Sequence, residues 1–128
     1  MDIGKTFGID KDAAENGKWF DLEDGGSVRV AKLGCLAFKT EVQRLQKPFL
    51  AILNSSMDSS EILDKITTDA MAKTILLDWK DITMDGETLP YSTDKAKELL
   101  REYPDFREIV SALSAERRHF QPKDIVEK

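Results

Sequence analysis

Gly34 separates two kinds of hydrophobic spacing, and this change of period limits the folds that the chain can adopt. Before it, residues 18–23 and 27–33 alternate β-forming side chains with polar ones around an Asp-Gly-Gly turn signal at 24–26. After it, apolar residues recur at steps of three and four, as on one face of a helix. The sequence therefore predicts an α+β fold, mostly helical, with an N-terminal β-hairpin packed against four to five helices.

Two long helices are predicted after the hairpin. The first spans about 36–54, and Pro48 should kink or split it because proline removes a backbone hydrogen bond. The second runs from Asp58 to about Leu77, and Asp58 with an acid three residues on forms a variant of the capping box. Its apolar side is expected to pack, while Asp69 and other charged residues face water.

The second half of the chain predicts a turn region followed by two shorter helices. Irregular structure with at most short strands is expected over 76–91, where an Asp-Gly pair signals a turn and a proline excludes a central strand. Ser92 can cap a helix that ends near Glu102. Pro104 can open the last helix, which should end near Phe120.

The 128 residues fit one domain with one hydrophobic core. Residues 1–17 show no hydrophobic period and predict a flexible N-terminal lead-in, 18–120 form the single globular domain, and 121–128 form a C-terminal tail. The expected core is drawn from Phe20, Val28, Val30, Val42, Leu45, Phe49, Ile62, Ile66, Leu77, Trp79, Leu99, Ile109 and Leu113.

Charge and composition argue against several partners. The net charge is −5 and no stripe of Lys or Arg offsets it, so nucleic acid is not expected to bind. No stretch approaches the roughly 18 apolar residues of a membrane span, so no membrane partner is expected. Cys35 is the only cysteine, which excludes an intrachain disulfide and suits the cytosol.

No motif in the sequence supports catalysis, a metal site or a cofactor. Residues 81–86 resemble the start of a calcium loop, but Pro90 interrupts it and Ser92 stands where a bidentate Glu is needed. His119, the only histidine, suits a helix C-terminus and has no catalytic partner at a recognisable spacing. We therefore predict a non-enzymatic protein, with a hydrolase built from carboxylates that meet in space as a remote alternative.

Two kinds of side chain are candidates for a protein interface. Trp19 and Trp79 stand outside the helical stripes, so each is either a core residue at an element junction or an aromatic anchor for a partner. Met57, Met71 and Met84 are candidates for an adaptable apolar surface. The sequence leaves these structural and functional interpretations open.

A set of segments in the second half resembles the C-terminal half of tail assembly chaperones of long-tailed bacteriophages. These segments are Leu76 to Ile82, Asp85 with Gly86, Leu89 to Ser92 with Pro90 and Tyr91, Ala96, Leu99 with Leu100, and Phe106 to Leu113. The hairpin over 19–33 is compatible with the same family, so the resemblance covers about 18–120. The break at Pro48 departs from it.

The resemblance implies a protein that binds the tape-measure protein, keeps it soluble, recruits tail-tube protein and stays out of the virion. It also implies the cytoplasm of an infected bacterium and a family in which short and frameshifted longer forms occur, with this chain similar to the short form. A structural component of a phage tail or a related contractile particle is the alternative. Self-association through exposed apolar helix faces is left open.

Overall fold

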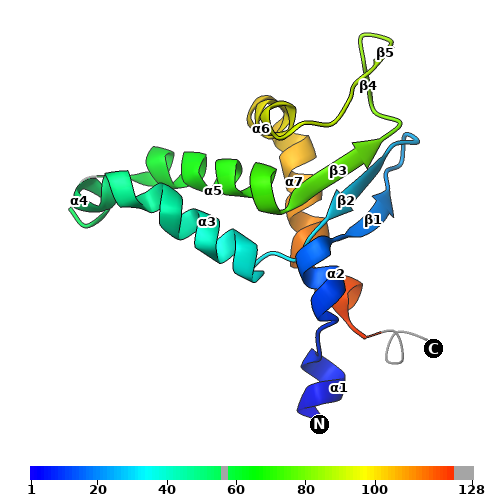
Figure 1. Cartoon of the computed structure of the whole chain (residues 1–128), viewed down its shortest axis with the longest axis horizontal. Helices are drawn as coiled ribbons and strands as arrows, with labels where there is room; N and C mark the ends of the chain where they lie inside the picture. Colours follow the sequence, from blue (N-terminus) through cyan, green and yellow to red (C-terminus); the bar gives the residue numbers. More distant parts are fainter. Residues whose placement is uncertain (56–57, 123–128) are drawn as a thin grey trace.

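The chain forms a small antiparallel sheet with helices on one side, and a pair of long helices projects away from it (Figure 1). The computed structural model describes residues 1–55 and 58–122. Most of the described elements are helical, which confirms the predicted α+β, mostly helical class.

The sheet has the order β1-β2-β3 and both pairings are antiparallel. The predicted hairpin is confirmed as β1 (Lys18–Asp21) and β2 (Ser27–Val30). The third strand, β3 (Leu76–Lys80), lies where at most short strands were expected, but its first two residues were assigned to the preceding helix because the leucines continue the helical spacing. Pairing with β2 decides its conformation, since this contact satisfies backbone groups that an unpaired edge would leave open.

Two long helices form a projecting arm. They are α3 (Leu36–Gln46) and α5 (Ser60–Thr74), which lie side by side, with the short η1 (Lys47–Phe49) and α4 (Leu50–Leu53) at the far end (Figure 1). The expected break at Pro48 is confirmed.

The start and end of α5 differ in detail from the prediction. Asp58 Oδ1 accepts the backbone N–H of Ser60, two residues on, at 3.0 Å, and the N-cap position is Ser59. The capping box is therefore wrong, although Asp58 does bind an N–H of the first turn. The helix ends at Thr74 and not near Leu77, because β3 begins there.

The second half follows the predicted order. A short hairpin of β4 (Thr83–Met84) and β5 (Glu87–Thr88) leads to α6 (Thr93–Glu102), whose Ser92 side chain accepts the Lys95 N–H at 3.0 Å. The last helix, α7 (Pro104–Ala115), stops before the predicted end, and a 3₁₀ turn, η2 (Arg117–Phe120), replaces its last turn.

The N-terminal segment is more ordered than predicted. It forms α1 (Ile3–Phe7) and α2 (Lys11–Asn16), and α2 docks on the rest of the chain. The buried Ala14 accepts the Lys32 N–H at 2.9 Å, and the Asp10 N–H donates to the Phe120 carbonyl at 2.7 Å. The expectation of a flexible lead-in is corrected here, because such short helices contain too few apolar residues to show a period.

The core lies between the sheet and α5, α6 and α7. Of the expected members, Val28, Val30, Ile66, Trp79 and Leu99 are buried. The expected members that are only half-buried are Phe20, Val42, Leu45, Phe49, Ile62, Leu77 and Leu113. Ile109 is 48% exposed, so its place in the predicted core is wrong. The largest fully buried side chains that the prediction missed are Phe120, Met71, Ile75, Leu76, Leu100 and Val110.

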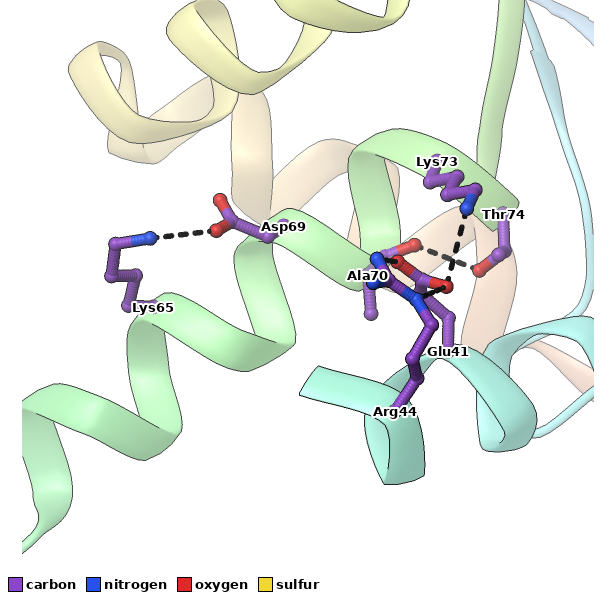
Figure 2. Close-up of polar contacts among 7 residues, drawn as sticks. All are labelled: Glu41, Arg44, Lys65, Asp69, Ala70, Lys73 and Thr74. Carbon is purple, nitrogen blue, oxygen red and sulfur yellow. Dashed lines mark hydrogen bonds and ion pairs between the residues drawn. The ribbon is translucent and has the colours of Figure 1, made fainter. Parts of the chain in front are cut away.

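Two buried carboxylates join the helices. Glu41 of α3 binds Arg44 Nη2 at 2.5 Å and Lys73 of α5 at 3.3 Å (Figure 2). Asp69 of α5 binds Lys65 at 2.9 Å (Figure 2) and Arg101 of α6 at 2.5 Å. The prediction that Asp69 faces water is therefore wrong, because Arg101 arrives from a separate helix to pair with it.

Asp69→Asn is expected to lower the free energy of unfolding at pH 7 by about 1–2 kcal/mol, because two charge-assisted hydrogen bonds are lost. Burial raises the pKa of Asp69, but the hydrogen bonds and charges of Lys65 and Arg101 outweigh it, so the pKa is lowered below 3.8. This stability is present above the unfolded pKa and is lost as pH falls through the folded one.

The measurement is urea unfolding of both proteins at pH 7 and again near pH 3, with Glu108→Gln, an exposed site on α7, as the control. The difference in the free energy of unfolding between the parent and Asp69→Asn should be smaller at the acidic pH. A gap of equal size at both values would contradict a role for the ionised carboxylate.

Candidate functional site

A groove of about 760 Å³ lies between the tip of the β1–β2 hairpin, the β3–β5 segment and the helices α6 and α7. The strand side contributes Leu22, Ile82, Met84 and Leu89. All four side chains are half-buried, so they present apolar atoms to the groove while packing against the core. The floor of the groove is therefore mostly apolar.

Helix α7 has one broad apolar face, which is buried along its middle and partly exposed along the edge that borders the groove. Val110 and Ser114 are fully buried against the core. Phe106, Ile109 and Leu113, at steps of three and four, line the groove, and Ile109 is 48% exposed. Along this stripe a partner helix could pack its own side chains.

The rim of the groove is acidic. It carries the carboxylates of Asp21, Glu23, Asp24, Asp81 and Asp105, and none of the described lining residues is Lys or Arg. Oppositely charged segments are therefore attracted to this opening, and acidic ones are repelled.

Trp79 and Tyr91 support one wall of the groove from behind. Trp79 is 5% exposed, and its Nε1 donates to the Leu89 carbonyl at 2.7 Å. Tyr91 donates to the Leu76 carbonyl at 2.8 Å, and its ring meets the indole edge-on at 4.8 Å. Burial raises the pKa of Tyr91. Of the two interpretations of Trp79, the structure supports a core residue at an element junction.

Trp19 lies apart from the groove, on the opposite face of the sheet from the buried Val28 and Val30. It is 40% exposed, and the Lys80 ammonium lies 4.2 Å from its ring centroid. A cation–π contact of this kind holds the ring in place without burying it. Trp19 therefore remains available on the outer sheet face.

The other candidate residues separate into different places. Met84 lines the groove, Met71 is 2% exposed and contributes to the core, and Met57 lies outside the described residues. Met71 is thus not part of an exposed surface.

Asp85 and Gly86 form the β4–β5 turn with φ of +54° and +83°, a pair of left-handed conformations that suits an Asp-Gly hairpin turn. Both residues are exposed, and so is Pro90 after the hairpin. None of the three lines the groove, but the loop that they shape carries Leu89, which does.

A second apolar surface lies on the arm. A cavity of about 300 Å³ between α3 and α5 is lined by Leu45, Phe49, Ile62 and Ile66 together with charged residues of both signs. Nearby, Leu50, Ile52 and Leu63 are 40–48% exposed. This surface has no single sign of charge, in contrast to the groove.

The groups capable of reaction have structural partners. His119 Nδ1 lies 3.0 Å from the Leu113 carbonyl, and its ring contacts that of Phe20 with the centroids 4.7 Å apart and the planes tilted by 56°. Cys35 is buried at the start of α3. Within residues 1–55 and 58–122, no group of three or more His, Cys, Asp or Glu side chains is placed to hold a metal ion. In the same part of the chain no helix is long and apolar enough to cross a membrane.

Comparison with known protein families shows which family the chain belongs to. The family described as YdaY prophage protein matches residues 33–128, three quarters of the chain. The chain belongs to this family. This prophage protein is therefore phage-derived. The sequence resemblance had predicted a phage origin. No curated protein and no solved structure matches it.

The family match covers α3 to α7 and so includes both helices of the arm and the groove residues from Asp81 onward. Sequence reasoning placed Ile109 and Leu113 in the core and did not select the rim carboxylates. The sequence held no signal that separates the groove residues from the core, because Phe106, Ile109, Val110 and Leu113 lie on one face of the same helix.

Proposed function

We propose that this prophage protein is a tail assembly chaperone. It binds the tape-measure protein, keeps it soluble and promotes tail-tube assembly in the host cytoplasm without entering the virion. The observation that carries the proposal is the groove: segments 76–92 and 106–113, which resemble those chaperones, supply most of its apolar residues.

The physical argument concerns long helical proteins that aggregate through apolar stripes. A chaperone for such a protein must cover a stripe with a surface of matching shape and must itself stay soluble. The stripe of α7 together with the strand-side residues offers such a surface. The acidic rim and the net charge of −5 oppose self-aggregation of the free protein.

The test is co-expression of the candidate tape-measure protein with and without this chain, followed by affinity capture and assembly of particles. We expect the long protein to be soluble only with its partner, a complex to co-purify, and finished particles to lack this chain. Insolubility of the tape-measure protein in both cases, with no complex, would contradict the proposal.

A structural component of a phage tail is the second candidate, and the apolar far end of the arm favours it. Exposed Leu50 and Ile52 on α4 are the kind of residues that a permanent contact between subunits would bury. In that case purified particles should contain the chain at a constant ratio to tail-tube protein. The same surface supports self-association in solution, which sedimentation measurements would detect.

A further inference from the structure

We infer that the groove takes a cationic amphipathic helix, with one apolar stripe flanked by Lys or Arg. This inference deepens the proposed function and rests on it for the groove being the docking surface. It names the chemistry of the bound segment, which the resemblance does not supply.

The shape of the floor favours a helix over an extended strand. Its apolar residues on α7, Phe106, Ile109 and Leu113, form a ridge along one helix, and a second helix packs its own ridge beside such a row. A bound strand would instead need a long free strand edge for its backbone. The groove-lining hairpin offers strands of only two residues each, Thr83–Met84 and Glu87–Thr88, and such a short edge cannot hold a bound strand.

The apolar floor alone would accept any amphipathic helix, and the rim narrows this choice. Five carboxylates surround the opening, and none of the six ion pairs among the described residues involves any of them. In contrast, Glu41, Asp64 and Asp69 each pair with a cation within the fold. Within the described part of the chain, the rim carboxylates therefore lack the cation partners that these three residues have.

Charge of one sign around an apolar floor selects partners by attraction and by repulsion. Lys or Arg beside the apolar stripe of a helix would lie close to these carboxylates once the stripe contacts Ile109. Glu or Asp at the same positions would face charges of the same sign and be repelled. The apolar contact supplies most of the affinity, and the charge of the rim determines which amphipathic helices bind.

The test uses two designed peptides as probes, each of about 18 residues with the same leucine stripe. One carries Lys on both flanks of the stripe and the other carries Glu. Binding of fluorescein-labelled peptides to the full chain is measured by fluorescence anisotropy at about 50 mM and about 500 mM salt. We expect the Lys peptide to bind at least about tenfold more tightly at low salt and the difference to shrink at high salt.

Matched variants locate the effect on the rim. The rim variant combines Glu23→Gln, Asp24→Asn and Asp81→Asn, three exposed changes that leave the capping and ion-pair contacts intact. The control variant combines Glu61→Gln, Glu102→Gln and Glu108→Gln, exposed residues that do not line the groove, and changes the net charge equally. We expect about tenfold weaker binding of the Lys peptide to the rim variant and little change for the control.

Three outcomes would overturn the inference: neither peptide binds, both bind equally at low salt, or the rim and control variants weaken binding to the same extent. The last outcome would mean that the net charge of the protein attracts the Lys peptide and that the rim carboxylates have no special part in binding. None of these affects the co-expression result, so the chaperone proposal can survive the failure of this inference. Conversely, selective peptide binding without solubilisation of the tape-measure protein would retain the site and reject the chaperone.

Discussion

Trp79→Ala is expected to lower the free energy of unfolding by about 3–5 kcal/mol, the largest effect of any substitution considered. The indole is 5% exposed, so its removal leaves a cavity between β3 and the chain before α6. The Leu89 carbonyl also loses its 2.7 Å hydrogen bond from Nε1, and Tyr91 loses the ring that it contacts edge-on. Because Leu89 lines the groove, its wall should loosen together with the core.

The matched control is Trp19→Ala, which removes the same side chain from an exposed position on an edge strand. It should cost about 1 kcal/mol or less, since it removes a partly hydrated ring and one cation–π contact with Lys80. Urea unfolding followed by circular dichroism measures both variants. Equal losses for the two tryptophans would contradict the assignment of Trp79 as the core residue and Trp19 as the surface one.

Ile109→Glu is expected to weaken capture of the tape-measure protein by about a hundredfold, because it places an unpaired carboxylate on the apolar floor and adds to an acidic rim. The fold should be retained, since the side chain is 48% exposed and faces away from the core that Val110 contacts. Thermal unfolding of the free variant checks this before binding is measured. The binding measurement is the amount of tape-measure protein that co-purifies after co-expression.

Two controls separate the groove from the other apolar surface. Leu36→Glu introduces the same change at a residue that is 71% exposed and lines neither cavity, so it should not alter capture. Leu63→Glu introduces it on the arm. Normal capture by Ile109→Glu with loss of capture by Leu63→Glu would move the docking surface from the groove to the arm.

The arm and the groove are connected through two ion pairs, one with the buried carboxylate of Asp69 and one on the surface. Asp69 links α5 to Arg101 of α6, and Asp64 links α5 to Arg107 of α7 at 2.6 Å. These contacts hold the arm against the two helices that form the floor of the groove. A change at the arm that disturbs Asp69 should therefore also alter the groove, whereas an exposed change such as Leu63→Glu should not.

Local sequence was sufficient for the elements whose conformation depends on neighbours along the chain. The Asp-Gly-Gly turn predicted the β1–β2 hairpin, Pro48 predicted the break between α3 and α4, and Ser92 and Pro104 predicted the starts of α6 and α7. In each case a turn, a cap or a missing N–H acts within a few residues, so no tertiary contact is needed to infer it.

The sequence was not sufficient where one pattern is compatible with two environments. Residues 74–77 continue a helical period, and only pairing with β2 makes 76–80 a strand. The sequence predicts that Asp69 faces solvent, because its partner Arg101 belongs to another helix and is far away in the chain. The apolar face of α7 gives no sign of where the core ends along it, and only packing buries Val110 completely while Ile109 stays 48% exposed.

The sequence by itself determined the class of fold, the order of most elements and a phage-related resemblance, because these depend on spacing, turn chemistry and motif order. Only the tertiary structure decided the groove. Its rim carboxylates extend from Asp21 to Asp105 in the chain, and no local pattern relates them. They meet because the hairpin tip, the segment after β3 and the start of α7 pack around one core, which leaves Ile109 exposed between them.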